Sequence, residues 1–465
     1  MGIFCLASYL DQKGVQVKII DGARQSSYME LIEKELPDTD FVGISAMTTQ
    51  LPSALKISKF VKKTNNIIPT IWGGFHPTLF PEPTASHRLV DIVVIGEGEE
   101  TLLEIIKNNG GNLESIKGIA FKKNGKVILT PERPLLNLEN LPAPNWKLMP
   151  QEIVSNLSQV PIHTSRGCPH RCTFCVNVIT KNHWRAKPVE QVINDIKNAL
   201  TEACPGKNHI VFWDENFFVD ENRVKVIFQK MIENNIKVYW SAGCRTSYFN
   251  NDFINDELLN LMKKSGCELL SLGAESGSTR ILEKIKKDTT PEQILYSAQQ
   301  CVKHGISPIY SFMAGLPGEK WSDIKKTLRL IDRLTSVDRG VKIIGPQTFR
   351  PYPGSPLFEE CVSMGWHPPS SIEDWSKSMS GELNYLDSHE LPWLKNPDVI
   401  ESLDVVVRLG ANPLKYALKL EVKANKVLKF LFILLCRIRW KLKFFHWPIE
   451  YKLAKKFISK SSAVN

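Results

Sequence analysis

The sequence predicts an α/β protein with two parallel-sheet domains and a basic helical tail. Short runs of β-branched and apolar residues alternate with stretches of helical periodicity, and many of the runs end in glycine or in polar residues. At 465 residues the chain can form two or three domains. We expect five segments, with bounds at 1–125, 126–160, 161–355, 356–410 and 411–465.

The first segment, 1–125, has the elements of a Rossmann-like doubly wound sheet. Apolar runs that favour strands lie at 15–21, 41–46, 67–72 and 91–95, and the last two are each followed by glycine. The stretch 51–63 repeats its apolar residues at helical spacing. A parallel sheet of this kind opens a ligand crevice at the carboxyl ends of its strands.

The start of the chain departs from that pattern, because residues 1–4 read as the beginning of a helix and the usual opening strand is missing. Either the start site is misassigned or the sheet has lost a strand. After residue 125 the sequence predicts an irregular linker over 126–160 because of its prolines. These are Pro131, Pro134, Pro142, Pro144 and Pro150.

The segment 161–355 predicts a second series of βα units. Six such units fit a partial (β/α)6 TIM-like barrel, whose ligand site lies at the carboxyl ends of the strands. The expected strands are 161–165, 209–214, 237–242, 269–274, 306–314 and 341–349. The following segment, 356–410, is rich in proline and tryptophan and shows little periodicity.

Composition and charge point to a globular protein with a separate basic tail. The chain is 43% apolar and 23% charged, which is ordinary for a soluble protein. Its net charge of +10 belongs to the tail, where 411–460 has thirteen Lys or Arg against two Glu. Seven of the ten cysteines are scattered singly and no signal peptide is evident, so we expect the reducing cytoplasm.

The remaining three cysteines, Cys168, Cys172 and Cys175, lie within eight residues with the spacing C-x3-C-x2-C. One loop can then aim three thiolates at a compact cluster and leave a fourth metal position without a protein ligand. A zinc site is an alternative, although its closure by His170 from inside the loop is sterically awkward. A buried structural trio is the other alternative.

The cysteine loop resembles the signature of the radical SAM superfamily. The resemblance implies a [4Fe-4S] cluster that holds S-adenosylmethionine through its fourth iron. Reductive cleavage of the cofactor would yield a 5′-deoxyadenosyl radical, which takes a hydrogen atom from the substrate. The resemblance also places Phe174 near the adenine, although Phe174 could equally be a packing residue.

Polar residues follow the expected barrel strands. The resemblance implies that Glu275 and Ser276 contact polar groups of S-adenosylmethionine, and that the turn beginning at Gly315 lies beside the adenine. Asp214 and Glu215 could serve a ligand, but acids at a strand end more often cap the chain or form a solvated rim. Five of the scattered cysteines read as buried apolar residues: Cys204, Cys244, Cys267, Cys301 and Cys361. Cys244 is the one to check because it lies at a strand end beside Arg245.

Glycines and hydroxyls at the strand ends of the first segment resemble the cobalamin-binding domain that precedes many radical SAM barrels. The resemblance implies contacts from Ser45, Thr48, Gly73, Gly74, His76, Gly96 and Glu97. The alternative is that these glycines simply form tight βα turns. The motif D-x-H-x-x-G is absent, so we expect a bound cobalt to lack a protein imidazole ligand.

The tail predicts a basic amphipathic helix on an anionic membrane. Trp440 and Trp447 suit a membrane interface, while the longest uncharged run, 430–436, is too short to cross a bilayer. A helix packed on the protein is the alternative, and no RNA-binding signature supports nucleic acid. One helical face carries Val427, Leu431, Leu434, Ile438, Leu442 and Phe445.

As a whole, the chain resembles cobalamin-binding radical SAM enzymes such as anaerobic porphyrin-ester cyclases and lipid or hopanoid methylases, in which 356–410 would cap the barrel. This implies radical methylation or rearrangement at an unactivated carbon of a small-molecule, lipid-like substrate. A reductant such as a ferredoxin or flavodoxin would supply electrons, and the enzyme would be cytoplasmic and peripheral to the membrane. The alternatives are an oxidase or cyclase whose cobalamin domain is only structural, and a redox-sensing Fe–S protein without turnover.

Overall fold

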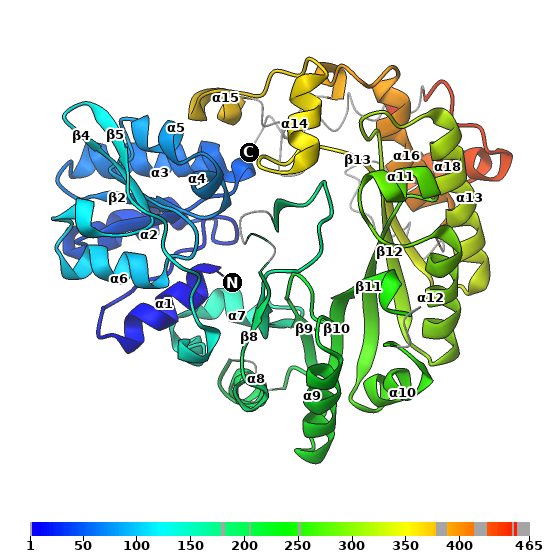
Figure 1. The fold of residues 1–465 in the computed structure, drawn as a ribbon, viewed down its shortest axis with the longest axis horizontal. Coiled ribbons are helices and arrows are strands. Elements are labelled where there is room, and N and C mark those ends of the chain that lie inside the picture. Colours follow the sequence, from blue (N-terminus) through cyan, green and yellow to red (C-terminus); the bar gives the residue numbers. More distant parts are fainter. Residues whose placement is uncertain are drawn as a thin grey trace. The chain divides into compact units, whose positions relative to one another are not determined.

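The computed structural model forms two compact units (Figure 1). The N-terminal unit comprises Met1–Pro161, Asn177–Lys207 and His367–Asp387, and the barrel unit comprises Ile162–Val176, Asn208–Trp366 and Ser388–Asn465. The structure describes residues 2–177, 181, 183–203, 206–249, 253–377, 388–412, 426–448 and 451–452. Cys204 and about half of the expected tail, at 413–425, 449–450 and 453–465, lie outside the described residues.

The N-terminal unit contains a five-stranded sheet in the order β1-β2-β3-β4-β5. The first three strands are parallel, as the sequence predicts, and the last two form an antiparallel hairpin. Asn124 and Gly125 both have positive φ in the hairpin turn, which suits the right-handed twist of the strands. The strands are β1 (Val42–Ser45), β2 (Thr70–Gly73), β3 (Ile92–Val94), β4 (Ile119–Lys123) and β5 (Lys126–Leu129).

Helices pack around this sheet (Figure 1). The chain opens on α1, which confirms the expected initial helix. The core joins Ile71, Ile92 and Phe121 of the strands to Ile105 of α6. The helices are α1 (Gly2–Gln12), α2 (Tyr28–Glu35), η1 (Leu36–Asp38), η2 (Thr48–Gln50), α3 (Leu51–Thr64), α4 (Phe75–Leu79), α5 (Pro81–Ser86), α6 (Glu99–Lys107) and η3 (Leu113–Ser115).

The strand predicted at 15–21 is wrong, because 15–21 has no strand structure. Ile19 is buried without a sheet, and three further apolar residues are partly buried. Val15 and Val17 pack beside Tyr9 and Leu10, and Ile20 packs in a second cluster near α2. The apolar run therefore predicts packing against the rest of the unit, but it does not predict the backbone hydrogen bonds that define a strand.

The predicted linker holds several short elements. Lys126–Leu129 is a strand of the sheet, so the irregular part begins after Leu129. The other elements of the unit are η4 (Leu138–Asn140), η5 (Trp146–Leu148), α7 (Gln151–Ser155), β8 (Arg185–Ala186), α8 (Val189–Asn198), the π-helical η7 (Ala199–Ala203) and α15 (Ile372–Lys377). The short strand β7 (Ser165–Arg166) belongs to the barrel unit.

The barrel unit is organised by a six-stranded sheet in the order β6-β9-β10-β11-β12-β13, which is the chain order that a partial (β/α)6 barrel requires. The pairs from β9 to β13 are parallel. Helices α12 and α13 lie along one side of the sheet (Figure 1). The strands are β6 (Val160–Ile162), β9 (His209–Phe212), β10 (Tyr239–Cys244), β11 (Cys267–Glu275), β12 (Ser307–Ala314) and β13 (Lys342–Thr348).

The helices of the barrel unit connect the strands and then cover the last of them. Helix α16 lies against both β13 and α18. No helix among the described residues is long and apolar enough to span a membrane. The helices are α9 (Glu221–Glu233), η8 (Thr246–Phe249), α10 (Asp256–Lys264), α11 (Thr279–Lys284), α12 (Pro291–Lys303), α13 (Trp321–Val337), α14 (Pro356–Ser363), η9 (Ser388–Glu390), α16 (Pro397–Gly410) and α18 (Lys426–Leu442).

Helix α18 buries one face and leaves a second apolar face exposed. Ile433, Cys436 and Trp440 are buried at helical spacing, and Gly410 of α16 allows the close approach because a Cβ there would lie 2.7 Å from the Trp440 Cβ. The prediction that Trp440 lies at a membrane interface is therefore wrong. Phe445 is also buried, so it does not belong to the exposed stripe, and the Val427 side chain lies outside the described residues.

Candidate functional site

The cysteine loop follows β7 in the barrel unit, and backbone contacts hold it at several points. The Gly167 N–H donates to a carboxylate oxygen of Glu215 at 3.1 Å. Further along, the Thr173 N–H donates to the Ile285 carbonyl, and the Thr173 carbonyl accepts from the Leu357 N–H. The half-buried cysteines of this loop thus have their positions fixed by β9, α11 and α14.

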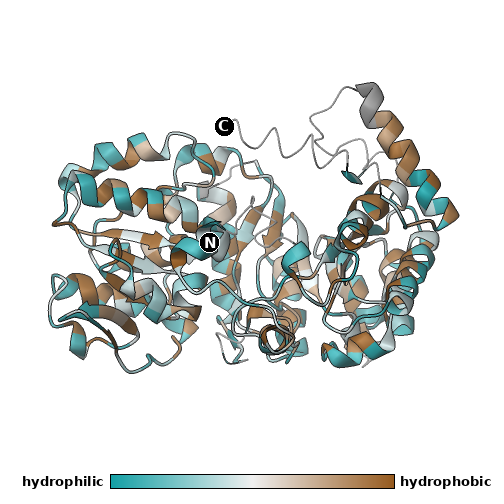
Figure 2. Cartoon of the chain, turned by 90° about the horizontal axis from the view of Figure 1, so that it is seen from above, coloured by the Kyte–Doolittle hydropathy of each residue, from teal (hydrophilic) through white to brown (hydrophobic). Residues whose placement is uncertain are grey.

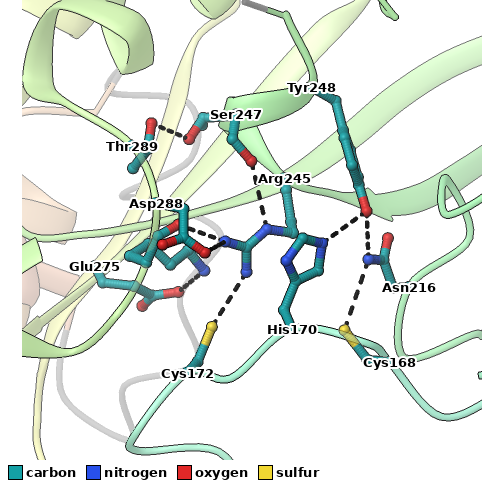
Figure 3. Close-up of polar contacts among 12 residues, drawn as sticks. Cys168, His170, Cys172, Asn216, Arg245, Ser247, Tyr248, Glu275, Asp288 and Thr289 are labelled. Atoms are coloured by element: carbon teal, nitrogen blue, oxygen red, sulfur yellow. Dashed lines mark hydrogen bonds and ion pairs between the residues drawn. The ribbon is translucent and has the colours of Figure 1, made fainter. Parts of the chain in front are cut away.

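Donors from two neighbouring strand ends reach the cysteine sulfurs (Figure 3). Arg245, after β10, donates from its guanidinium to the Cys172 Sγ at 3.1 Å. Asn216, after β9, places its amide nitrogen 3.6 Å from the Cys168 Sγ. Such donors stabilise thiolates, which are the form of cysteine that binds iron or zinc.

His170 pairs with a tyrosine on the side of the cysteine loop. Its Nε2 lies 2.9 Å from the Tyr248 hydroxyl, which also accepts a hydrogen bond from Asn216 at 2.7 Å. Burial, with a smaller effect of Arg245, lowers the pKa of His170 to about 4. A neutral imidazole can then accept the Tyr248 O–H through Nε2 (Figure 3).

Four of the five cysteines predicted to be buried are described, and all four are buried. Cys244, Cys267, Cys301 and Cys361 lie in the core, and burial raises the pKa of each thiol. Among the described residues, no three His, Cys, Asp or Glu side chains are arranged to hold a single metal ion. The loop cysteines differ from these four buried cysteines because they are partly exposed and accept N–H donors. Three thiols are a soft donor set that suits an iron–sulfur cluster. A cluster holds its cysteine sulfurs further apart than a single metal ion does.

Glu275 ends β11 in a constrained arrangement. Its carboxylate pairs with Lys287 at 2.9 Å, and the ammonium of Lys287 lies 5.7 Å from the Phe174 ring centroid. The Glu275 backbone has a φ of 62°, where the pairing of β11 with β12 shifts by one residue. Gly273 leaves room for the pair, because a Cβ there would lie 2.7 Å from the Lys287 Nζ.

The other expected residues at this edge are held by the protein. The Ser276 hydroxyl is buried, lies 3.2 Å from the Thr327 hydroxyl and accepts from the Ser278 N–H. The Gly315 N–H donates to Glu319 at 2.6 Å, while its carbonyl accepts from the Trp393 indole at 2.8 Å. Gly315 is required, because its φ is 80° and a Cβ would lie 2.9 Å from Leu394.

Asp214 has the structural role that was the alternative in the sequence analysis. It is buried and accepts from the backbone and hydroxyl of Thr164 and from the hydroxyl of Ser165. Burial raises its pKa. The carboxylate therefore fixes the chain just before the cysteine loop.

In the N-terminal unit, the predicted residues gather at the carboxyl ends of β1, β2 and β3. The Thr48 hydroxyl lies 3.2 Å from Nδ1 of His76, which is fully buried. The His76 Nε2 has no hydrogen-bond partner among the described residues, and burial lowers the pKa of His76 to about 4. Gly43 and Gly96 have open space where a Cβ would be, so the backbone is accessible to a ligand there.

Three predicted residues of this unit make contacts within the protein. A Cβ on Gly74 would lie 2.9 Å from the Ser45 hydroxyl, so these two residues form a tight turn. The Glu97 carboxylate pairs with Arg185 at 2.8 Å and accepts from the Leu136 N–H at 2.9 Å. Glu97 thereby ties the connector to the edge of the sheet.

Comparison with known proteins assigns the family. A model of the radical SAM superfamily matches residues 162–331, and a B12 binding domain model matches residues 1–106. An uncharacterized methyltransferase of Pyrococcus horikoshii is 32% identical over 389 residues, which are 80% of this chain and 82% of that protein. The chain belongs to the radical SAM superfamily. An anaerobic magnesium-protoporphyrin IX monomethyl ester cyclase of Rubrivivax gelatinosus is 27% identical over 76% of this chain and 65% of the cyclase.

Solved radical SAM structures share the fold. OxsB with aqua-cobalamin aligns with a TM-score of 0.71 at 18% identity, over 94% of this chain and 69% of OxsB. TsrM from Kitasatospora setae, with tryptophan and a SAM analog, aligns with a TM-score of 0.63 at 16% identity, over 79% of this chain and 74% of TsrM. In the alignment with apo OxsB, this chain spans half of that protein.

The radical SAM domain implies a [4Fe-4S] cluster and S-adenosylmethionine, and the B12-binding domain implies cobalamin. The relatives of this chain include methyltransferases and a cyclase, so this chain is an enzyme. Two side chains near the cysteine loop, Tyr248 and Lys287, carry no local motif and could not be predicted from the sequence. Arg245 lies directly after β10, and only the parallel pairing of β9, β10 and β11 brings these residues together.

Proposed function

We propose that this chain catalyses radical methylation of an unactivated carbon, with Cys168, Cys172 and Cys175 as the ligands of the cluster. The observation that carries the proposal is the convergence of N–H donors on half-buried thiols of one loop, within a radical SAM barrel. The bound cluster would supply the electron that cleaves S-adenosylmethionine. A ferredoxin or flavodoxin is our proposed source of that electron.

The S-adenosylmethionine pocket would use the carboxyl ends of β11 and β12. Phe174 offers an aromatic face from the cysteine loop, and the Lys287–Glu275 pair lies next to it. Gly315 offers its backbone as an edge, positioned by Glu319. Ser276 would act through its hydrogen bonds to the turn that follows Glu275 rather than by direct contact.

Cobalamin would bind at the strand ends of the N-terminal unit and donate the methyl group. The open backbone at Gly96 and the unpaired nitrogen of buried His76 support this assignment. Gly73 and Thr48 lie at the same strand ends, and Glu97 would hold the surrounding connector. His76 does not stand in a D-x-H-x-x-G motif, so we do not propose it as a ligand to cobalt.

Anaerobic turnover with methyl-labelled S-adenosylmethionine tests the proposal. Reconstituted enzyme, dithionite and an extract of apolar small molecules should give 5′-deoxyadenosine and a product that carries the labelled methyl group. A cyclase or oxidase would give 5′-deoxyadenosine without label transfer. A redox sensor would give neither compound, and either result would contradict the methylase assignment. Cys172→Ala serves as the control without a complete cluster.

We further propose that α18 brings the enzyme to an anionic membrane and that its substrate is lipid-like. Leu431, Leu434, Ile438 and Leu442 of α18 are 43% to 71% exposed. Hydrophobic residues predominate along this helix (Figure 2). Trp447, 77% exposed, follows the helix, and Arg439 and Lys441 add positive charge. Apolar side chains flanked by cations suit an anionic bilayer surface.

Vesicle sedimentation tests the membrane proposal. Leu434→Gln and Ile438→Gln should each weaken binding to phosphatidylglycerol vesicles about tenfold, because each removes a side chain whose burial is worth roughly 1.5–3 kcal/mol. Leu129→Gln, at an equally exposed leucine of β5, should have no effect. Equal sedimentation of all three variants with phosphatidylglycerol vesicles would contradict the proposal. So would equal sedimentation of the wild type with neutral and with phosphatidylglycerol vesicles. Point variants are preferable to truncation, because α18 also buries Ile433 and Cys436.

A further inference from the structure

Helix α15 belongs to the N-terminal unit although it follows the barrel in sequence. It lies against α3 and η2, and η2 begins with Thr48. Its first turn is fixed by Ser371, whose hydroxyl donates to Asp374 and accepts from the Asp374 N–H. A segment distant in sequence is thus docked next to the strand ends that carry the predicted cobalamin residues.

The contact is made mainly by Trp375. This side chain is 2% exposed, and its ring lies 5.9 Å from the ring of His76 and 5.4 Å from that of Phe80. Glu373 adds an ion pair with His87 at 2.9 Å, but its side chain is half exposed, so this pair contributes little. The aromatic contact is therefore the anchor of α15.

Trp375 encloses an imidazole whose hydrogen bonding is incomplete. His76 has no exposed surface and shares its Nδ1 with Thr48, while its Nε2 has no hydrogen-bond partner among the described residues. Leaving a buried polar atom unpaired is costly, and such atoms are rare in folded proteins. A ligand that offers a hydrogen-bonding group to Nε2 would remove that cost.

We propose that α15 forms a wall of the cobalamin site, where Trp375 shields His76 so that the imidazole Nε2 pairs with the nucleotide tail of the cofactor. This inference rests on the proposed function and adds residues from outside the B12-binding segment. Shielding matters because the hydrogen bond to the tail then has no water to compete with it. Without Trp375, water can reach Nε2, and the tail gains less by binding.

Binding of hydroxocobalamin and of cobinamide, which lacks the nucleotide tail, distinguishes this role from simple packing. Titrations followed by absorbance should show that Trp375→Ala and His76→Phe each weaken hydroxocobalamin about tenfold. Neither variant should change the affinity for cobinamide. The double variant should bind no more weakly than the worse single variant, because both changes remove the same interaction. Lys377→Gln, at an exposed position of α15, is the matched control.

A second measurement uses the wild type alone, so that it does not depend on the folding of any variant. Amide hydrogen exchange over 372–377 should slow when hydroxocobalamin is added and stay unchanged with cobinamide. Equal weakening of both ligands, unchanged binding in Trp375→Ala, or tighter binding in that variant would overturn the inference. Failure of the wild type to bind either corrinoid would instead refute the cobalamin part of the proposed function.

Discussion

Replacement of Arg245 by methionine should make the cluster harder to reduce. Methionine keeps much of the length of the side chain and removes the charge. Arg245 is 7% exposed and donates to the Cys172 Sγ at 3.1 Å and to the Lys287 carbonyl. A reduced cluster carries one more negative charge than an oxidised one, so a guanidinium in this position stabilises the reduced form more.

The size of the effect follows from the strength of that contact. A hydrogen bond from a charged donor is worth about 1.5–3 kcal/mol. If about 1.4 kcal/mol of it depends on the extra electron, the midpoint potential falls by about 59 mV, the one-electron equivalent of a tenfold change. Anaerobic redox titration followed by electron paramagnetic resonance measures this shift directly, independently of turnover.

Asp288→Asn is the control for Arg245→Met. The Asp288 carboxylate lies 3.7 Å from the same guanidinium, but it is 68% exposed and therefore screened by water. Its loss should raise the potential by much less than Arg245→Met lowers it. An unchanged potential in Arg245→Met, with the iron content intact, would refute the idea that this residue acts on the cluster.

Three further predictions concern glycines and a buried acid. Gly273→Ala should push Lys287 away from Glu275. Binding of S-adenosylmethionine, measured by equilibrium dialysis, should then weaken about tenfold at unchanged iron content. Full affinity in this variant would contradict the pocket assignment. Burial raises the pKa of Glu319 to about 7, so the folded state favours its protonated form and loses stability as pH rises from about 4.5 to 7. Glu319→Gln should therefore gain thermal stability relative to wild type between pH 5.5 and 8, by up to roughly 3 kcal/mol, and a constant difference would argue against this. Gly410→Val would crowd Trp440, so hydrogen exchange in α18 should accelerate while exchange in β9 to β12 stays unchanged; equal protection of α18 in both proteins would contradict the packing.

The sequence predicted those elements whose signals are local. The strands β1 to β3 and the barrel strands were found because buried parallel strands read as short apolar runs. The cysteine loop was found because its spacing is short and specific. The β4–β5 hairpin was missed although Asn124-Gly125 is a strong turn signal.

The features that depend on distant pairing could not be found in this way. Asn216 and Arg245 meet the cysteines only because the parallel strands β9 and β10 end at one edge. The docking of Trp375 beside His76 joins residues almost 300 positions apart, and no local pattern reports it. Helix α18 has apolar residues on two faces, so periodicity alone could not tell that Trp440 faces the protein.

Metal analysis tests the central claim most directly, because everything else depends on the cluster held by the three loop thiols. Protein purified without oxygen should contain about four iron and four sulfide per chain, and the Mössbauer spectrum should be that of a cubane with one distinct iron after S-adenosylmethionine is added. Replacement of any one of Cys168, Cys172 and Cys175 by alanine should lose that signal, whereas Cys244→Ala should keep it. Zinc in place of iron, or an intact cluster in the Cys172→Ala protein, would contradict the account.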